Sequence, residues 1–258
     1  MKLRTLSAAA LLATLALGTL APTAASAATD LKSNGSVKII EGGAGGPDTE
    51  TTDPEEPGTK LPPTDPGSPD ENTNPATGSL IIEKTTNLEF GEVGTSADDI
   101  KEKYATPMSF EGGTKKRGAY VQWADVRSGA SFGYTVNAQL TKQFTSGGNV
   151  LGGSTISFSN GLAVADGANT NLIPSNVATG FTLSEAPTDK KTVVTASQAA
   201  EEGKGRFIMS FGQSDDSTIG TPGTEDESVE LKIPAGTASN MVEGVYDAEI
   251  TWTIEAAP

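Results

Sequence analysis

The sequence predicts an all-β protein built as an antiparallel β-sandwich of the immunoglobulin-like or a related kind. From Ser79 onward, short segments alternate apolar and polar residues with the period of two that is typical of strands. Clusters of Gly, Asn, Asp and Ser separate these segments, and no stretch longer than two turns follows a helical period. A closed barrel is the alternative architecture.

Residues 1–27 have the composition of a secretory signal peptide. Lys2 and Arg4 precede an apolar run, and Ala25-Ser26-Ala27 offers small residues at a cleavage site, so we predict cleavage after Ala27. The apolar run is shorter than the roughly 20 residues that a membrane-spanning helix needs. We therefore expect a secreted protein with no membrane insertion after signal cleavage.

The next segment, residues 28–40, contains one strand-like stretch. In residues 36–40, SVKII, three large apolar residues follow the turn-forming pair Asn34-Gly35, which predicts a short strand. An isolated strand is not stable in water, so we expect this one to pair with a sheet of the downstream domain.

Residues 41–75 are rich in proline, glycine and acidic residues. They hold eight of the fifteen prolines and nine acidic residues, with no aromatic residue. Such a composition buries too little apolar surface to offset the entropy of ordering the chain. We therefore predict a disordered spacer at residues 41–75, followed by one β domain at residues 76–258.

Within residues 76–258, the predicted strands come in a regular series. They are residues 79–84, 88–93, 119–126, 132–140, 154–159, 192–196, 206–211, 228–233 and 245–254. Two of them alternate most regularly: the even-numbered residues from Phe132 to Leu140, and those from Tyr246 to Ile254, are apolar. Each of these two strands is predicted to have one buried face and one solvated face.

Composition excludes several classes of function. The net charge of −15 repels phosphate backbones, so nucleic acid is not an expected partner. The chain has no cysteine and no histidine, which excludes disulfides, histidine-based triads and imidazole zinc sites. Paired carboxylates such as Asp98-Asp99 and Asp215-Asp216 lie in polar, turn-like segments where carboxylates are simply solvated. We predict a non-enzymatic protein with no catalytic residue, metal or cofactor.

Two segments carry a resemblance to a known family. The end of the chain, GVYDAEITWTIEAAP, resembles the closing signature of the WxL domain family of Gram-positive surface proteins. The internal segment YVQWADVRSGASFGYTVNAQLTKQF is similar to the first motif region of that family. Where the family typically has Trp-x-Leu, this chain has Tyr134-x-Val136 and Trp252-x-Ile254, which keep an aromatic and an aliphatic residue on one strand face.

The resemblance implies a protein on the cell wall and cell surface, held there non-covalently, with peptidoglycan as its ligand. It also implies partnership with other cell-surface proteins. The alternative function is a structural or adhesive subunit that binds a partner surface protein or a host extracellular matrix protein instead of the wall.

Tyr134, Val136, Trp252 and Ile254 allow two interpretations. They form a platform for wall sugars or peptides, or they are core residues of two neighbouring strands. The second interpretation is favoured because large apolar residues on an alternating face are ordinarily buried. It makes the last strand a central one, anchored by Trp252.

Trp123 is a separate candidate for ligand binding. On its strand it shares a face with Asp125 and Arg127, and an indole beside ionisable groups is typical of a pocket rim as well as of a core. We leave the exposed, ligand-facing position and the buried position open. Asp125 and Arg127 are expected to form a local ion pair.

Overall fold

The computed structural model describes residues 32–186 and 188–257, and divides the chain into residues 1–39 and residues 40–258. The predicted signal peptide and its cleavage site after Ala27 lie outside the described residues. Of residues 1–39, the described part contains no strand and no helix. No described helix is long and apolar enough to cross a membrane.

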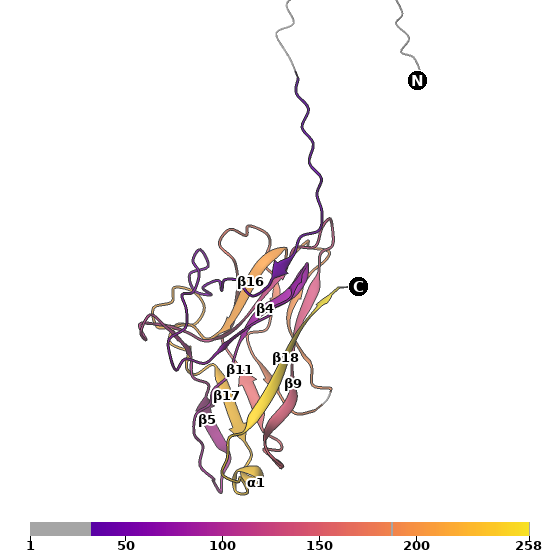
Figure 1. Ribbon diagram of the computed structural model, residues 1–258. Helices are drawn as coiled ribbons and strands as arrows, with labels where there is room; N and C mark the ends of the chain where they lie inside the picture. Colours follow the sequence, from indigo (N-terminus) through magenta and orange to yellow (C-terminus); the bar gives the residue numbers. More distant parts are fainter. Residues whose placement is uncertain (1–31, 187, 258) are drawn as a thin grey trace, which may run out of the picture. The chain divides into compact units, whose positions relative to one another are not determined.

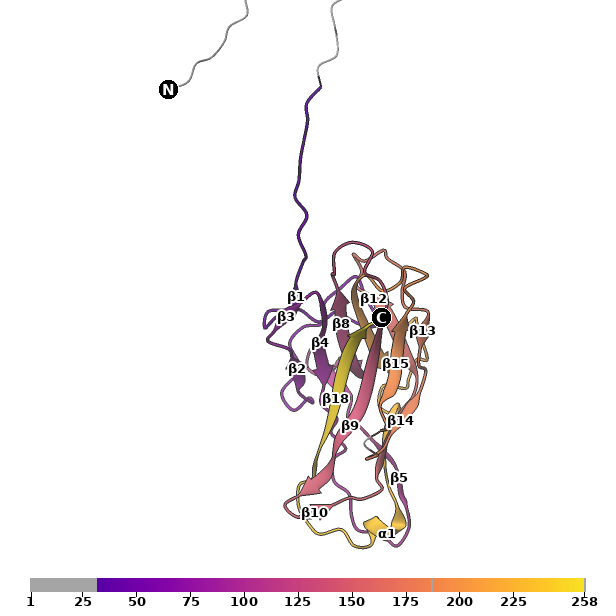
Figure 2. The ribbon, with the colours of Figure 1, turned by 90° about the vertical axis from the view of Figure 1, so that its right-hand side faces the viewer.

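Antiparallel strands form three larger sheets and two small ones among the described residues (Figures 1 and 2). The first sheet has the order β12 (Gly161–Ala165), β16 (Gly205–Phe211), β8 (Ala119–Asp125), β4 (Leu80–Thr86) and β2 (Glu71–Thr73). The second contains β10 (Asn149–Val150), β9 (Tyr134–Ser146), β15 (Lys191–Ala196) and β13 (Asn176–Val177), with β18 (Asp247–Ala256) paired to β9.

The third sheet has the order β14 (Phe181–Leu183), β11 (Thr155–Phe158), β17 (Val229–Ile233) and β5 (Ile100–Tyr104). The small sheets pair β1 (Ala44–Gly45) with β3 (Thr77–Gly78), and β6 (Met108–Phe110) with β7 (Lys115–Arg117). One short helix, α1 (Ala235–Ala238), is present in the described part. These antiparallel sheets confirm the predicted all-β fold class.

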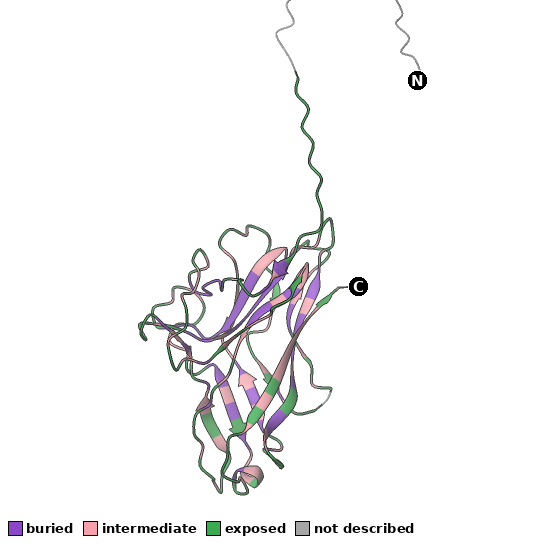
Figure 3. Cartoon of the chain, viewed as in Figure 1, coloured by how far each residue is buried: buried purple, intermediate pink, exposed green. Residues whose placement is uncertain are grey.

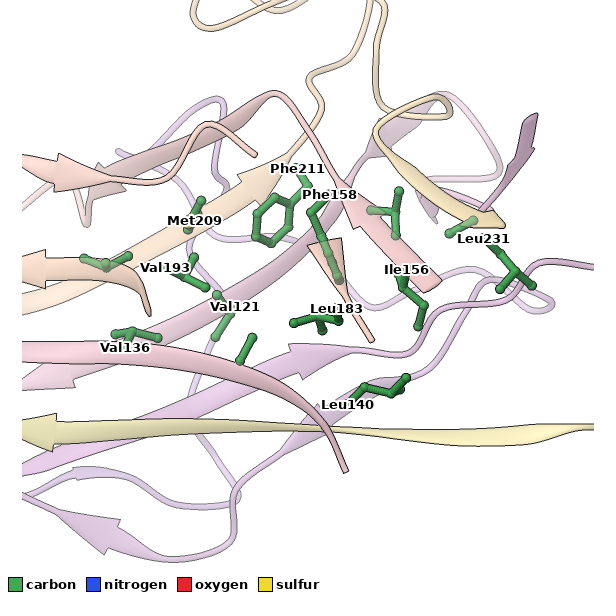
Figure 4. Close-up of a cluster of buried hydrophobic side chains, with 14 of the residues drawn as sticks. Val121, Val136, Leu140, Ile156, Phe158, Leu183, Val193, Met209, Phe211 and Leu231 are labelled. Carbon is green, nitrogen blue, oxygen red and sulfur yellow. The ribbon is translucent and has the colours of Figure 1, made fainter. Parts of the chain in front are cut away.

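One apolar core joins the three larger sheets. Val121 and Met209 of the first sheet point into the same space as Val136 of the second sheet and Leu183 of the third (Figure 4). The buried face predicted for β9 is confirmed by Tyr134, Val136, Ala138 and Leu140, but Asn137 on the predicted solvated face is buried as well. Burial of such a cluster is the main stabilising contribution to folding.

Strand β8 departs from simple alternation, since every residue from Tyr120 to Asp125 is buried. One face meets the main core. The other face is covered as well: Tyr120 packs in a second cluster with Met108 and Phe110, and Ala124 packs with Ala44. The sheet is therefore covered on both sides in this region, which buries polar residues such as Gln122 together with the apolar ones.

The prediction of a disordered spacer at residues 41–75 is wrong. This segment contributes β1 and β2, and Thr52 and Asp53 in it are fully buried. The Thr52 N–H donates to Gln122 Oε1 at 2.8 Å, and Arg117 Nε donates to Asp53 Oδ1 at 2.7 Å. Composition predicted too little apolar surface for order, but the segment is fixed by a hydrogen bond to Gln122 of the first sheet and by ion pairs with Arg117 of the small β6–β7 sheet. The compact β unit accordingly begins near residue 40 instead of at residue 76.

Two further strand predictions are wrong. Residues 36–40 form no strand, and Val37, Ile39 and Ile40 are 82%, 77% and 73% exposed. The apolar pattern there is short, and no described sheet edge supplies it with a partner. Residues 88–93 also form no strand, although Phe90 is buried in the core.

The sequence predicts that the last strand is central, but in the structure it is an edge strand. Within the described residues, β18 pairs only with β9, beside which it runs in both ribbon views (Figures 1 and 2). No residue of β18 is fully buried, in contrast to β8 (Figure 3). The C-terminal segment is thus held by one neighbouring strand and by the inward side chains of its alternating face.

Candidate functional site

The first motif is buried. Trp123, Tyr134 and Val136 have no exposed surface, so Trp123 does not occupy the ligand-facing position that the sequence left open. Trp123 Nε1 donates a hydrogen bond to Tyr134 Oη at 2.6 Å, and the indole stacks on Phe207 with ring centroids 5.9 Å apart. Burial raises the pKa of Tyr134 far above its ordinary value. These side chains therefore hold the sheets together and are out of reach of a surface ligand.

Gly203 explains how the tyrosine ring fits. Its backbone has a φ of +87°, and a Cβ atom there would lie 2.6 Å from Tyr134 Cε1. Only glycine combines this left-handed conformation with so close an approach.

Asp125 and Arg127 form the predicted ion pair. Arg127 Nη2 donates to Asp125 Oδ2 at 2.8 Å and to the Gly133 carbonyl at 3.0 Å, while Lys204 Nζ lies 3.2 Å from Asp125 Oδ1. The hydrogen bond to Asp125 raises the pKa of the Arg127 guanidinium, against the opposing effect of its burial. Asp125 is 1% exposed, so the pair fixes the connection between β8 and β9 and does not form a polar rim.

The second motif lies on β18 and is half-buried. Ile254 is directly opposite Val136 in the antiparallel register, and Trp252 is opposite Ala138. The structure thus brings the two aliphatic motif residues together, but it does not place Trp252 beside Trp123 or Tyr134. Trp252 instead packs on three phenylalanines from other strands, with ring centroids 6.2–6.4 Å away: Phe158, Phe181 and Phe211.

A groove of about 350 Å³ opens beside Trp252. Its apolar lining includes Phe158, Phe211, Trp252 and Ile250, and its polar lining includes Asn72, Thr85, Thr86, Asn87, Glu89 and Asp247. It lies between the start of β18 and residues 85–90, which form the end of β4 and the segment after it. A concave site with aromatic surface and a few polar groups is the usual form of a small-ligand site.

Hydrogen bonds fix the polar side of this groove. Asn72 Nδ2 donates to Asn87 Oδ1 at 2.6 Å, and the Tyr120 N–H donates to Thr86 Oγ1 at 3.1 Å. Tyr120, which also lines the groove, donates its hydroxyl to Glu71 Oε2 at 2.5 Å. Burial, together with the nearby Glu71 carboxylate, raises the pKa of Tyr120 well above its ordinary value. The first two hydrogen bonds hold Asn87 and Thr86 in place on the groove, whereas the Tyr120 side chain packs in the second cluster, on the other face of the first sheet.

The comparison with known families decides the identity of the chain. A family model described as WxL domain, surface cell wall-binding, matches residues 26–258. The chain belongs to the WxL domain family. No curated protein and no solved structure matches it. The resemblance seen in the two motif segments is thereby confirmed, and the protein is a cell-wall-binding surface protein by family.

Within this WxL domain, the two motif positions have different environments. The Tyr134-x-Val136 position is part of the core, whereas Trp252 and Ile254 are partly accessible on an edge strand. Of the predicted binding residues, only Trp252 lines the groove. The matched family is one of wall-binding surface domains and not a catalytic one. Among the described residues, no cluster of three or more acidic side chains is arranged to hold a metal ion.

Sequence reasoning missed most of the groove. Residues 85–90 carry no ligand-binding motif, and Phe158 and Phe211 read as ordinary strand residues. These positions are far from residue 252 in sequence. They meet it only because the three larger sheets pack against one another. Alternation in residues 206–211 could identify Phe211 as inward-facing, but not the groove it helps to form.

Proposed function

We propose that this WxL protein is secreted through residues 1–27 and held non-covalently on a Gram-positive cell wall, with peptidoglycan bound in the groove beside Trp252. It acts without catalysis, together with other cell-surface proteins. One observation supports this proposal most directly. In a domain of a wall-binding family, Trp252 lies half-buried on the edge strand β18 and lines a groove. A partly exposed indole offers a flat apolar surface and an N–H donor, a combination that suits sugar and peptide ligands.

A groove-filling substitution tests the proposal with little loss of core contacts. Ala248 lines the groove on the inward face of β18, and Thr251 lies on the outward face of the same strand, where its hydroxyl contacts Thr141 Oγ1. We expect Ala248→Arg to reduce retention on purified peptidoglycan by about tenfold or more, equivalent to roughly 1.4 kcal/mol. Thr251→Arg adds the same charge to the same strand and is expected to leave retention unchanged.

Pull-down of the purified mature chain on purified peptidoglycan measures this effect, with circular dichroism as the check on folding. Equal retention of both variants would remove the groove from the binding site. Retention only in the presence of a second surface protein would favour the alternative function, in which the chain binds a partner and not the wall.

A further inference from the structure

We propose that the groove beside Trp252 recognises a positively charged alkylammonium group, the amine-bearing side chain of a wall peptide. This inference rests on the proposed function and specifies which part of peptidoglycan the groove binds. Its basis is the charge and the aromatic content of the groove.

The charged groups on the groove are all acidic. Glu89 lies on the segment after β4 and Asp247 at the start of β18, and both are exposed. Neither carboxylate forms a hydrogen bond or an ion pair within the described part of the chain. No lysine or arginine lines the groove. Two unpaired carboxylates from its two bordering segments attract a cation and repel an anion.

The aromatic surface supports the same choice. Trp252 is only half-buried and contributes to the groove between these two segments. The face of an indole attracts ammonium groups, and the attraction increases when the ammonium is partly removed from water. A lysine-like side chain also has an aliphatic stem, which can pack on Ile250 and Trp252 while its charged end meets a carboxylate.

Size and charge disfavour large occupants and anionic occupants of the groove. At about 350 Å³, the groove is near the lower end of the roughly 300–1,000 Å³ of small-ligand sites, so it holds one side chain or one sugar-sized group. Phosphate- or carboxylate-bearing wall polymers are disfavoured by Glu89 and Asp247 and by the net charge of −15. An uncharged sugar remains as the competing occupant, and the experiment separates it from an amine.

The test compares native peptidoglycan with peptidoglycan whose free amines have been acetylated. Acetylation removes the positive charge and leaves the glycan chain unchanged. We expect retention of the unmodified mature chain to fall by about tenfold on acetylated peptidoglycan.

Two double variants test whether the loss of retention on acetylated peptidoglycan arises at the groove. The double variant Glu89→Gln with Asp247→Asn is expected to lower retention on native peptidoglycan by about fivefold and to have no further effect on acetylated peptidoglycan. The matched control, Asp98→Asn with Glu243→Gln, removes the same charge from two exposed acidic residues outside the groove and is expected to bind like the unmodified chain.

The outcomes are distinguishable. Equal retention on native and acetylated peptidoglycan would overturn the amine inference, indicate a sugar ligand, and leave the proposed function standing. Equal loss of binding in the control double variant would also overturn the inference, because the effect of charge would then not belong to Glu89 and Asp247 of the groove. No retention on native peptidoglycan would overturn the proposed function itself.

Discussion

At the scale of single residues, the aromatic side chains of the two motif segments differ in how far they are buried. Trp123 and Tyr134 are fully buried and satisfy each other's polar groups, whereas Trp252 keeps part of its surface accessible. A buried N–H or O–H group must be paired, since leaving it unpaired costs more than the hydrogen bond contributes. The two tryptophans of this chain therefore have different roles, although both belong to motif segments.

We expect Tyr134→Phe to destabilise the fold, because the substitution leaves Trp123 Nε1 buried without an acceptor. The expected loss in free energy of unfolding is about 1–3 kcal/mol, measured by urea denaturation. Tyr246→Phe is the matched control, since its hydroxyl donates to the Val242 carbonyl at an exposed position. Equal losses for the two variants would contradict a structural role for the Trp123–Tyr134 pair.

At the scale of elements, the order of residues 43–75 depends on charge pairing between Asp53 and strand β7 of the small β6–β7 sheet. Asp53 has no exposed surface, and Arg117 and Lys115 both donate to its carboxylate. Burial by itself raises the pKa of Asp53, but hydrogen bonds from Arg117, the Glu55 N–H and Lys115 outweigh it and hold the pKa below its ordinary value of 3.8. A carboxylate in this position stabilises the folded state in its charged form.

Asp53→Asn is expected to lower the free energy of unfolding by about 3 kcal/mol near neutral pH, since Arg117 and Lys115 lose a buried partner. Because the folded-state pKa of Asp53 is depressed, its contribution is complete above pH values near 4 to 5 and is lost as the pH falls through the folded-state pKa. The stability difference between the unmodified chain and the variant should therefore shrink below pH 3.8.

Urea denaturation at several pH values measures this difference, and hydrogen exchange reports whether residues 44–60 lose protection. The control is Asp48→Asn, a substitution at an exposed carboxylate of the same segment. A stability difference that stays constant down to pH 3 would show that Asp53 is not the titrating group.

At the scale of the whole molecule, a single core cluster joins the three larger sheets. Trp123 belongs to this cluster, and Trp252 packs against it from the edge strand β18. Elements that share one core unfold together in domains of modest size. The edge strand β18 and the buried strand β8 therefore share one core, and we expect them to unfold together.

We therefore expect one cooperative unfolding transition for the compact β unit, residues 40–258. The single-tryptophan variants Trp252→Phe and Trp123→Phe report on the two regions separately by fluorescence. Within each variant, fluorescence and far-ultraviolet circular dichroism should give the same urea midpoint. A fluorescence transition in Trp123→Phe that precedes the circular dichroism transition would show that β18 detaches before the core unfolds.

The sequence by itself determined the fold class and most strand positions, because alternation and turn residues act locally. It also determined the family through Trp252-x-Ile254 and the segment around Tyr134. It did not determine the order of residues 43–75, where Asp53 and Thr52 find polar partners that composition cannot reveal, or the edge position of β18. Only the tertiary structure decided which motif residues stay accessible and how residues 85–90, Phe158 and Phe211 meet Trp252. Which side chains are buried, and where a groove forms, depends on which strands and sheets become neighbours. These neighbours come from segments that are far apart in the chain.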